Sequence, residues 1–93
     1  MNRGIDALSS LKMKEKIRKF IVENFLFGKR DIKDDQMLFE EGIIDSFGFV
    51  VLLSFIEKEF NIYFDRSEIM MENFNSIDHI VKSIEEKKAK KND

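Results

Sequence analysis

The chain has 93 residues and a mass of 11.0 kDa, with 16 Lys and Arg against 18 Asp and Glu, so its formal net charge is −2. It contains one His and no Cys, Pro or Trp, which excludes a disulfide framework, a thiolate metal site and a cysteine nucleophile. Length and composition are typical of one globular domain over residues 1–93, neither disordered nor embedded in a membrane.

The charge is unevenly distributed along the chain. Residues 1–30 hold eight basic and three acidic residues (net +5), residues 31–80 three basic and twelve acidic (−9), and residues 81–93 five basic and three acidic (+2). An acidic middle argues against nucleic-acid binding, because phosphate contacts need Lys and Arg, and it favours a basic protein partner. A solvated acidic surface without a partner is the alternative.

No stretch of the sequence is apolar over the length that a membrane span requires. The first ten residues lack the apolar core of a signal peptide. The longest apolar run, residues 49–53, is far shorter than the roughly 20 residues that cross a bilayer. We expect a cytoplasmic monomer with no membrane span.

The first element is an amphipathic helix over residues 11–27. Its apolar residues recur at three- and four-residue spacing: Met13, Ile17, Phe20, Ile21 and Phe25. Gly28 is a plausible stop, and Gly4 with Ser9 and Ser10 predicts a loose segment over residues 1–9. Residues 29–45 show no sustained period and predict a long loop pinned to the core by its apolar residues, a length that is uncommon unless functional.

The second half of the chain predicts three further helices. They cover residues 46–60, a short segment at 67–73, and a last helix that Asn75 or Ser76 caps. The last helix carries an inner face of Ile77, Ile80, Val81 and Ile84, and residues 87–93 should be loose. The chain is therefore expected to be an all-α four-helix bundle, three longer helices and one short, with its core over residues 11–86 and a long loop between the first two helices.

Ser46 stands where the long loop becomes a helix. A serine there is ordinarily an N-cap, whose hydroxyl satisfies free backbone N–H groups. The alternative is a functional hydroxyl. Gly48 lies two residues on, and a glycine costs roughly 1 kcal/mol inside a helix, which suggests a need for backbone freedom or access at this point.

The helix that begins at Ser46 has an unusual outer face. At 100° per residue, Phe47, Val50 and Val51 point outward beside Ser46, while Leu52 and Ile56 point inward. An exposed apolar patch next to a helix-starting serine is typical of a docking surface. The neighbouring loop could instead cover these residues as ordinary core.

These residues carry a family resemblance. Residues 38–47, Leu-Phe-Glu-Glu-Gly-Ile-Ile-Asp-Ser-Phe, resemble the phosphopantetheine attachment motif of acyl carrier proteins, whose centre is an Asp-Ser pair opening the second helix. The likeness extends over residues 11–86 through the basic first helix, the Glu-Lys-Glu-Phe end of helix two at residues 57–60, and the apolar stripe of the last helix.

The resemblance implies a carrier that is not itself an enzyme. Ser46 would receive covalent 4′-phosphopantetheine from coenzyme A through a phosphopantetheinyl transferase, and the arm's thiol would hold an acyl or aminoacyl group as a thioester. An activating ligase and downstream acyl-transfer enzymes would be the partners. Asp45 would be a recognition residue for the transferase. The acidic loop residues Glu40 and Glu41 and the apolar residues Phe47, Val50 and Val51 are the further candidates for recognition by partner proteins.

One departure separates this sequence from the carriers of fatty-acid synthesis, which bear acidic residues shortly after the serine. Those positions here are Gly48 and Val51. The sequence looks more like dedicated carriers that partner an adenylating ligase, such as D-alanyl or other aminoacyl carriers and the carriers of specialised-metabolite clusters. Bulky Phe47, Phe49 and Phe55 would crowd a bundle interior, which favours a short cargo.

Other functions find less support in the residues. Residues 31–42 are acidic, but Lys33, Gln36 and Gly42 occupy the third, sixth and twelfth positions, where a calcium loop needs an oxygen ligand, Gly and Glu. His79 lies off the apolar face and is expected to be exposed. No nucleophile–base constellation indicates an enzyme. The main rival is an unmodified helical adaptor that binds proteins through Phe47, Val50 and Val51.

Overall fold

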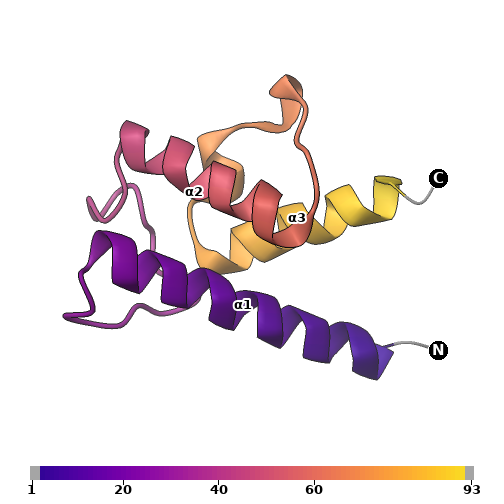
Figure 1. The fold of residues 1–93 in the computed structure, drawn as a ribbon, viewed down its shortest axis with the longest axis horizontal. Coiled ribbons are helices and arrows are strands. Elements are labelled where there is room, and N and C mark those ends of the chain that lie inside the picture. The colour runs from indigo at the N-terminus through magenta and orange to yellow at the C-terminus, as the bar shows by residue number, and fades with distance from the viewer. Residues whose placement is uncertain (1–2, 92–93) are drawn as a thin grey trace.

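The protein is all-α, as the apolar spacing predicts. The computed structural model describes residues 3–91, which contain three α-helices and no strand: α1 (Arg3–Phe25), α2 (Ser46–Phe60) and α3 (Ile77–Lys91). Two short 3₁₀ segments, η1 (Arg66–Glu68) and η2 (Met71–Phe74), connect α2 to α3. Figure 1 shows the start of α1 and the end of α3 at one end of the molecule, and the start of α2 at the other.

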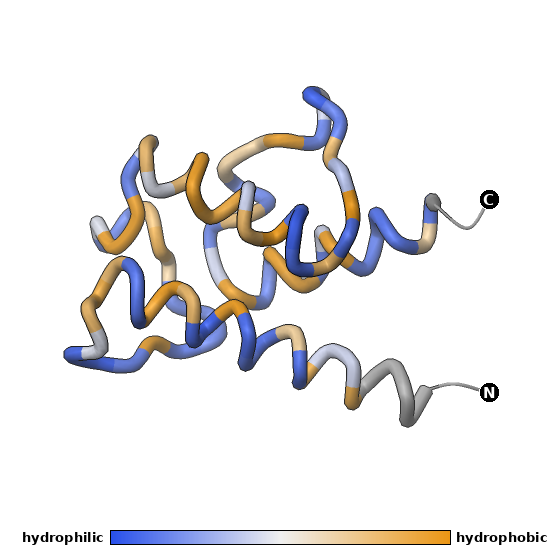
Figure 2. Tube along the Cα trace, viewed as in Figure 1, coloured by the Kyte–Doolittle hydropathy of each residue, from blue (hydrophilic) through white to orange (hydrophobic). Residues whose placement is uncertain are grey.

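The core is mostly aliphatic and draws on all three helices. The fully buried side chains at four-residue spacing are Ile17 and Ile21 of α1, Leu52 and Ile56 of α2, and Ile80 and Ile84 of α3. Figure 2 shows the corresponding alternation of hydrophobic and hydrophilic residues along the helices. This spacing places one stripe of each helix inward, so burial of these stripes holds the three helices together.

The first and last helices, α1 and α3, are both longer than predicted. α1 begins at Arg3 rather than at residue 11, so residues 3–9 are helical where a loose segment was expected. The Ser10 hydroxyl donates a hydrogen bond to Glu85 of α3, which ties the early part of α1 to its neighbour. Likewise α3 continues through residues 87–91, and Lys87 forms an ion pair with Glu68 at 2.9 Å. Residues 1–2 and 92–93 of the expected loose ends lie outside the described residues.

Gly28 does act as the stop for α1. Its backbone N–H donates to the carbonyl oxygen of Val22 at 2.9 Å, and its φ is +72°. Phe27 also has a positive φ, +56°, so the chain turns sharply out of the helix over these two residues. A left-handed φ favours glycine, which explains this residue at the helix end.

The expected short helix at residues 67–73 is absent, and the four-helix count is therefore not confirmed. In its place η1 and η2 are separated by an extended Met70, with φ −123° and ψ 132°. Glu68 closes one turn locally by accepting the Asp65 backbone N–H at 2.7 Å. The extended residue changes the direction of the chain, and Phe74 after it is fully buried. Core packing therefore overrides the local helical preference of this segment.

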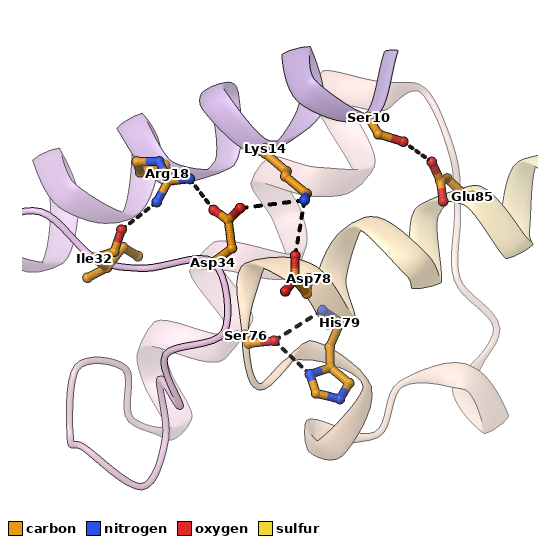
Figure 3. A network of polar contacts seen from close by, with 9 residues as sticks. All are labelled: Ser10, Lys14, Arg18, Ile32, Asp34, Ser76, Asp78, His79 and Glu85. Carbon is orange, nitrogen blue, oxygen red and sulfur yellow. Dashed lines mark hydrogen bonds and ion pairs between the residues drawn. The ribbon is translucent and has the colours of Figure 1, made fainter. Parts of the chain in front are cut away.

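The long loop between α1 and α2 is held against α1 and α3 through Asp34. Figure 3 shows the Asp34 carboxylate facing Arg18 and Lys14 of α1, with the Lys14–Asp34 pair at 3.5 Å. Lys14 also pairs with Asp78 of α3 at 3.2 Å, and the Asp78 backbone N–H donates to the Asp34 carbonyl oxygen at 3.0 Å. Hydrogen bonding from Arg18 lowers the pKa of Asp34, and hydrogen bonding to Asp78 raises the pKa of Lys14.

Ser76, rather than Asn75, caps α3. The Ser76 hydroxyl accepts the His79 backbone N–H at 3.1 Å, and Ser76 is almost fully buried. The side chain of His79 is exposed, as predicted, with its Nδ1 atom 2.6 Å from the same hydroxyl. Within residues 3–91, no helix has the length and apolar character needed to cross a membrane.

Candidate functional site

Asp45 begins α2, and this leaves Ser46 as the first helical residue. The Asp45 backbone is extended, and its carboxylate accepts the Gly48 backbone N–H at 2.8 Å. The N-cap interpretation of Ser46 is therefore wrong, because Asp45 performs that role. Ser46 is exposed, and its hydroxyl has no hydrogen-bond partner among residues 3–91. The structure thus presents a free hydroxyl at the start of a helix.

Gly48 is explained by close packing. A Cβ atom at this position would lie 2.8 Å from the Phe25 ring, 2.9 Å from the Ile44 side chain and 3.3 Å from the Asp45 carboxylate. Distances below 3.0 Å are not tolerated without movement of a neighbour. The glycine lets the first turn of α2 lie directly against the end of α1 and against the loop. Close approach of neighbouring groups, rather than the backbone freedom or access that we expected, is the reason for this residue.

The loop before Ser46 is closed by its own backbone hydrogen bonds. The Leu38 carbonyl oxygen accepts the N–H groups of Ile43 and Ile44, at 2.9 and 3.1 Å. Leu38, Ile43 and Ile44 are all buried. Gly42 allows the turn with a φ of +72°. Ser46 therefore follows a segment fixed on the core.

The outward face of α2 beside Ser46 is apolar, as predicted from helical geometry. Phe47 is 85% exposed, Val50 60% and Val51 50%; we call these three residues the α2 apolar face. Leu52 and Ile56, on the opposite side of the helix, are fully buried. Three neighbouring apolar side chains at such exposure on a small protein are typical of a contact surface.

The three phenylalanines expected to crowd the interior behave differently from one another. Phe47 points outward, so for this residue the expectation is wrong. Phe49 is half-buried between Phe39 and Phe74, at ring-centroid distances of 5.6 and 5.5 Å. Phe55 stacks on Phe20 at 4.0 Å between α2 and α1. Phe49 and Phe55 thus fill the space between the helices with aromatic rings.

Acidic side chains near the site fall into two groups. Asp34, Glu57 and Glu59 are engaged within the protein: Asp34 with α1, Glu57 with the Phe64 backbone N–H at 3.0 Å, and Glu59 with Lys16 at 3.0 Å. Glu40 and Glu41 are exposed, and neither forms an ion pair with a described residue. Each accepts only one amide hydrogen bond, from Asn75 at 2.7 Å and from Gln36 at 2.8 Å respectively. These two carboxylates therefore keep their charge available for a partner.

Ser46 has no activating group beside it among the described residues. No side chain of residues 3–91 hydrogen-bonds to its hydroxyl, and the chain's only histidine, His79, is bonded to Ser76 at the start of α3. An activated serine nucleophile needs a base within hydrogen-bond reach. The described residues also contain no cluster of His, Asp and Glu able to hold a metal ion.

Comparison with known proteins identifies the family. No family model matches the chain. A D-alanyl carrier protein of Streptococcus uberis is 34% identical over 76 residues, which cover 82% of this chain and 95% of that protein. The chain belongs to the acyl carrier protein family. A D-alanyl carrier protein of Streptococcus suis is 33% identical over the same shares, and one of Streptococcus equi subsp. zooepidemicus is 41% identical over 58 residues, 60% of this chain and 73% of that protein.

Membership of this family agrees with what the site offers. The named relatives are dedicated carriers, and the chain is closer to this type than to the carriers of fatty-acid synthesis. The chain is thus a carrier protein and not an enzyme, consistent with a serine that has no base beside it. The family implies a phosphopantetheine group and works with ligases and transferases.

Proposed function

We propose that Ser46 is the attachment site of 4′-phosphopantetheine, transferred from coenzyme A by a phosphopantetheinyl transferase. The chain would then hold an acyl or aminoacyl group and present it to partner enzymes. The observation that carries this proposal is the exposed and unbonded Ser46 hydroxyl, directly after the capping Asp45, in a member of the carrier family.

The residues around Ser46 fit a phosphodiester. Asp45 satisfies the Gly48 N–H, and the N–H groups of Ser46 and Phe47 have no partner among the described residues. Free N–H groups and the positive end of the helix dipole favour an anion at this place. The bound group would supply the thiol that forms the thioester, and the sequence contains no cysteine that could do so.

Recognition by the transferase would rest on Asp45 and on the exposed carboxylates of the loop. The transferase must supply the base, because no described side chain of the carrier hydrogen-bonds to the Ser46 hydroxyl. Glu40 and Glu41 would attract a basic enzyme surface and raise the rate of encounter. The α2 apolar face would then form the desolvated centre of the contact, with Phe47 as its most exposed side chain.

A short aminoacyl group is the cargo that the observations favour. The named relatives are D-alanyl carriers. Phe49 and Phe55 fill the interhelical space with packed rings, which disfavours storage of a long chain inside the bundle. The carrier should therefore accept D-alanine from an adenylating ligase. Competition between D-alanine, L-alanine and long-chain acyl donors tests this, and exclusive loading of a long-chain acyl group would contradict it.

The exposed α2 apolar face also suits an unmodified adaptor protein that binds its partner without any prosthetic group. The two functions are separated by incubation with coenzyme A and a broad-specificity phosphopantetheinyl transferase, followed by intact-mass measurement. The carrier function predicts a single phosphopantetheine adduct that is absent in Ser46→Ala. The adaptor function predicts an unchanged mass for the folded wild-type protein.

A further inference from the structure

Asn75 makes hydrogen bonds to three successive residues of the loop that leads to Ser46. Its carbonyl oxygen accepts the Leu38 N–H at 2.8 Å, and its side-chain oxygen accepts the Phe39 N–H at 3.1 Å. Its side-chain nitrogen donates to the Glu40 carboxylate at 2.7 Å. These contacts join residues that are 35 or more positions apart in the sequence, and Asn75 lies two residues before the first residue of α3.

The orientation of this amide is determined by its partners. A backbone N–H can only donate, so the group facing Phe39 must be the amide oxygen. A carboxylate at neutral pH can only accept, so the group facing Glu40 must be the NH₂. Both contacts favour the same orientation, and no other orientation satisfies either one. Asn75 is therefore suited to hold the loop backbone and one acidic side chain at the same time.

The backbone of Asn75 is itself held on both sides. Phe74 before it is fully buried and packs against Phe49 and Phe64, and Ser76 after it caps α3. Leu38 is in turn connected to the residues just before the site, since its carbonyl oxygen accepts the N–H groups of Ile43 and Ile44. Asp45 and Ser46 follow directly. Hydrogen bonds from Asn75 to residues 38–40, and from the Leu38 carbonyl oxygen to Ile43 and Ile44, thus link the segment before α3 to the segment before α2.

We propose that Asn75 is a positioning residue for recognition of Ser46: it fixes the Glu40 carboxylate and the loop backbone in the arrangement that a basic phosphopantetheinyl transferase reads. This inference rests on the proposed function of Ser46. One Glu40 oxygen accepts the amide of Asn75, which leaves the second oxygen for a cation on the enzyme. Prior alignment of a charged side chain lowers the entropy lost on binding, so Asn75 should act on the Michaelis constant.

The test compares variants at residue 75 for modification by a broad-specificity transferase with coenzyme A. Asn75→Asp keeps the acceptor for the Phe39 N–H but places a second carboxylate against Glu40. We expect a melting temperature close to that of the wild type, an unchanged kcat and a KM raised about tenfold, the lower end of the loss expected for one hydrogen bond to a charged group. Asn75→Ala should also speed amide exchange at Phe39, because that N–H loses its acceptor.

The control is Asn73→Ala, which truncates the same residue type in η2 where the side chain has no hydrogen-bond partner among residues 3–91. A double-mutant cycle with Glu40→Gln completes the design. The proposal requires that Asn75→Asp has no further effect on KM once Glu40 is neutral. An unchanged KM in Asn75→Asp, or an effect that is additive with Glu40→Gln, overturns the role of Asn75. The proposed function fails separately, if Ser46→Ala still acquires the adduct.

Discussion

The Asp45 carboxylate accepts the backbone N–H of Gly48 at 2.8 Å, and this contact decides which residue starts α2. It places the capping function on the aspartate, so the hydroxyl of the next residue, Ser46, is not consumed by the helix. The same Gly48 could not carry a side chain without striking Phe25 and Ile44. A structural cap and a close contact of two helices thus together leave one serine exposed at the helix start.

Two substitutions of Asp45 separate its structural role from its role in recognition. Asp45→Ala removes the cap and should lower the free energy of unfolding by about 1 kcal/mol, whereas Asp45→Asn retains an acceptor and should cost much less. Urea denaturation measures both. If Asp45 is also a recognition residue, Asp45→Asn should still slow modification of Ser46 in spite of its near-native stability. Equal stability of the alanine and asparagine variants would contradict the cap.

Gly48→Ala should destabilise the protein although alanine has the higher helix propensity. Propensity favours alanine by about 1 kcal/mol. The new methyl group would lie 2.8 Å from the Phe25 ring and 2.9 Å from Ile44, and overpacking of this kind costs typically 1–3 kcal/mol. We expect a net loss of about 1 kcal/mol in denaturant unfolding. Ser54→Ala, an exposed position of the same helix, is the control and should be neutral or slightly stabilising; a more stable Gly48→Ala would refute close packing.

Val51→Arg should leave the fold intact and impair loading. Val51 is 50% exposed, so the arginine can extend into solvent and the circular-dichroism melt should stay near that of the wild type. A charge within the α2 apolar face should weaken the contact with a D-alanine-adenylating ligase, and we expect at least a tenfold drop in loading efficiency. Ser54→Arg adds the same charge beyond this face and should have a smaller effect. Collapse of the melt would show that Val51 belongs to the core.

Stability should depend on Glu68 in acid. Hydrogen bonds from Lys87, from the Asp65 backbone and from Lys90 lower the pKa of Glu68 from 4.5 to about 2. A carboxyl group with a lower pKa in the folded state stabilises the fold above its unfolded pKa, and this contribution is lost as pH falls from about 4.5 towards 2. Because the pair is close to solvent, we expect its contribution to be only about 1 kcal/mol.

The measurement for Glu68 is the difference in unfolding free energy between the wild type and Glu68→Gln. This difference should be largest near neutral pH and shrink towards zero near pH 2, as the wild-type carboxyl becomes protonated. Glu72→Gln, an exposed residue without a partner among those described, provides the control and should show no such trend. A difference that does not change with pH would mean that the lysine contacts are not formed in solution.

Much of α2 could be predicted from the sequence, because local signals and core packing agree there. The helical period placed Leu52 inside and Phe47 outside, and the bounds at Ser46 and Phe60 are those observed. For α1 the local signals were misleading. Ser9 and Ser10 predict a break or a helix cap, but a serine costs little inside a helix, and Ser10 gains a contact with Glu85 that only the tertiary fold provides.

The features that could not be predicted depend on residues far apart in the sequence. Phe25 approaches Gly48 only after α1 and α2 have packed, so the residues next to Gly48 in the sequence do not explain the glycine. Asn75 reads as a possible cap in the sequence, yet its amide binds the loop 35 residues earlier. The Asp-Ser pair predicts the site, but only the backbone geometry of Asp45 shows that Asp45 is the cap and Ser46 the first helical residue.

The most direct test of the account is the intact mass of the protein after incubation with coenzyme A and a phosphopantetheinyl transferase. We predict one phosphopantetheine adduct on the wild type and on Ser54→Ala, an exposed serine of the same helix, and none on a folded Ser46→Ala. Peptide mapping should place the adduct on Ser46. An unmodified wild type, or an adduct that persists in Ser46→Ala, would contradict the assignment of Ser46 as the attachment site.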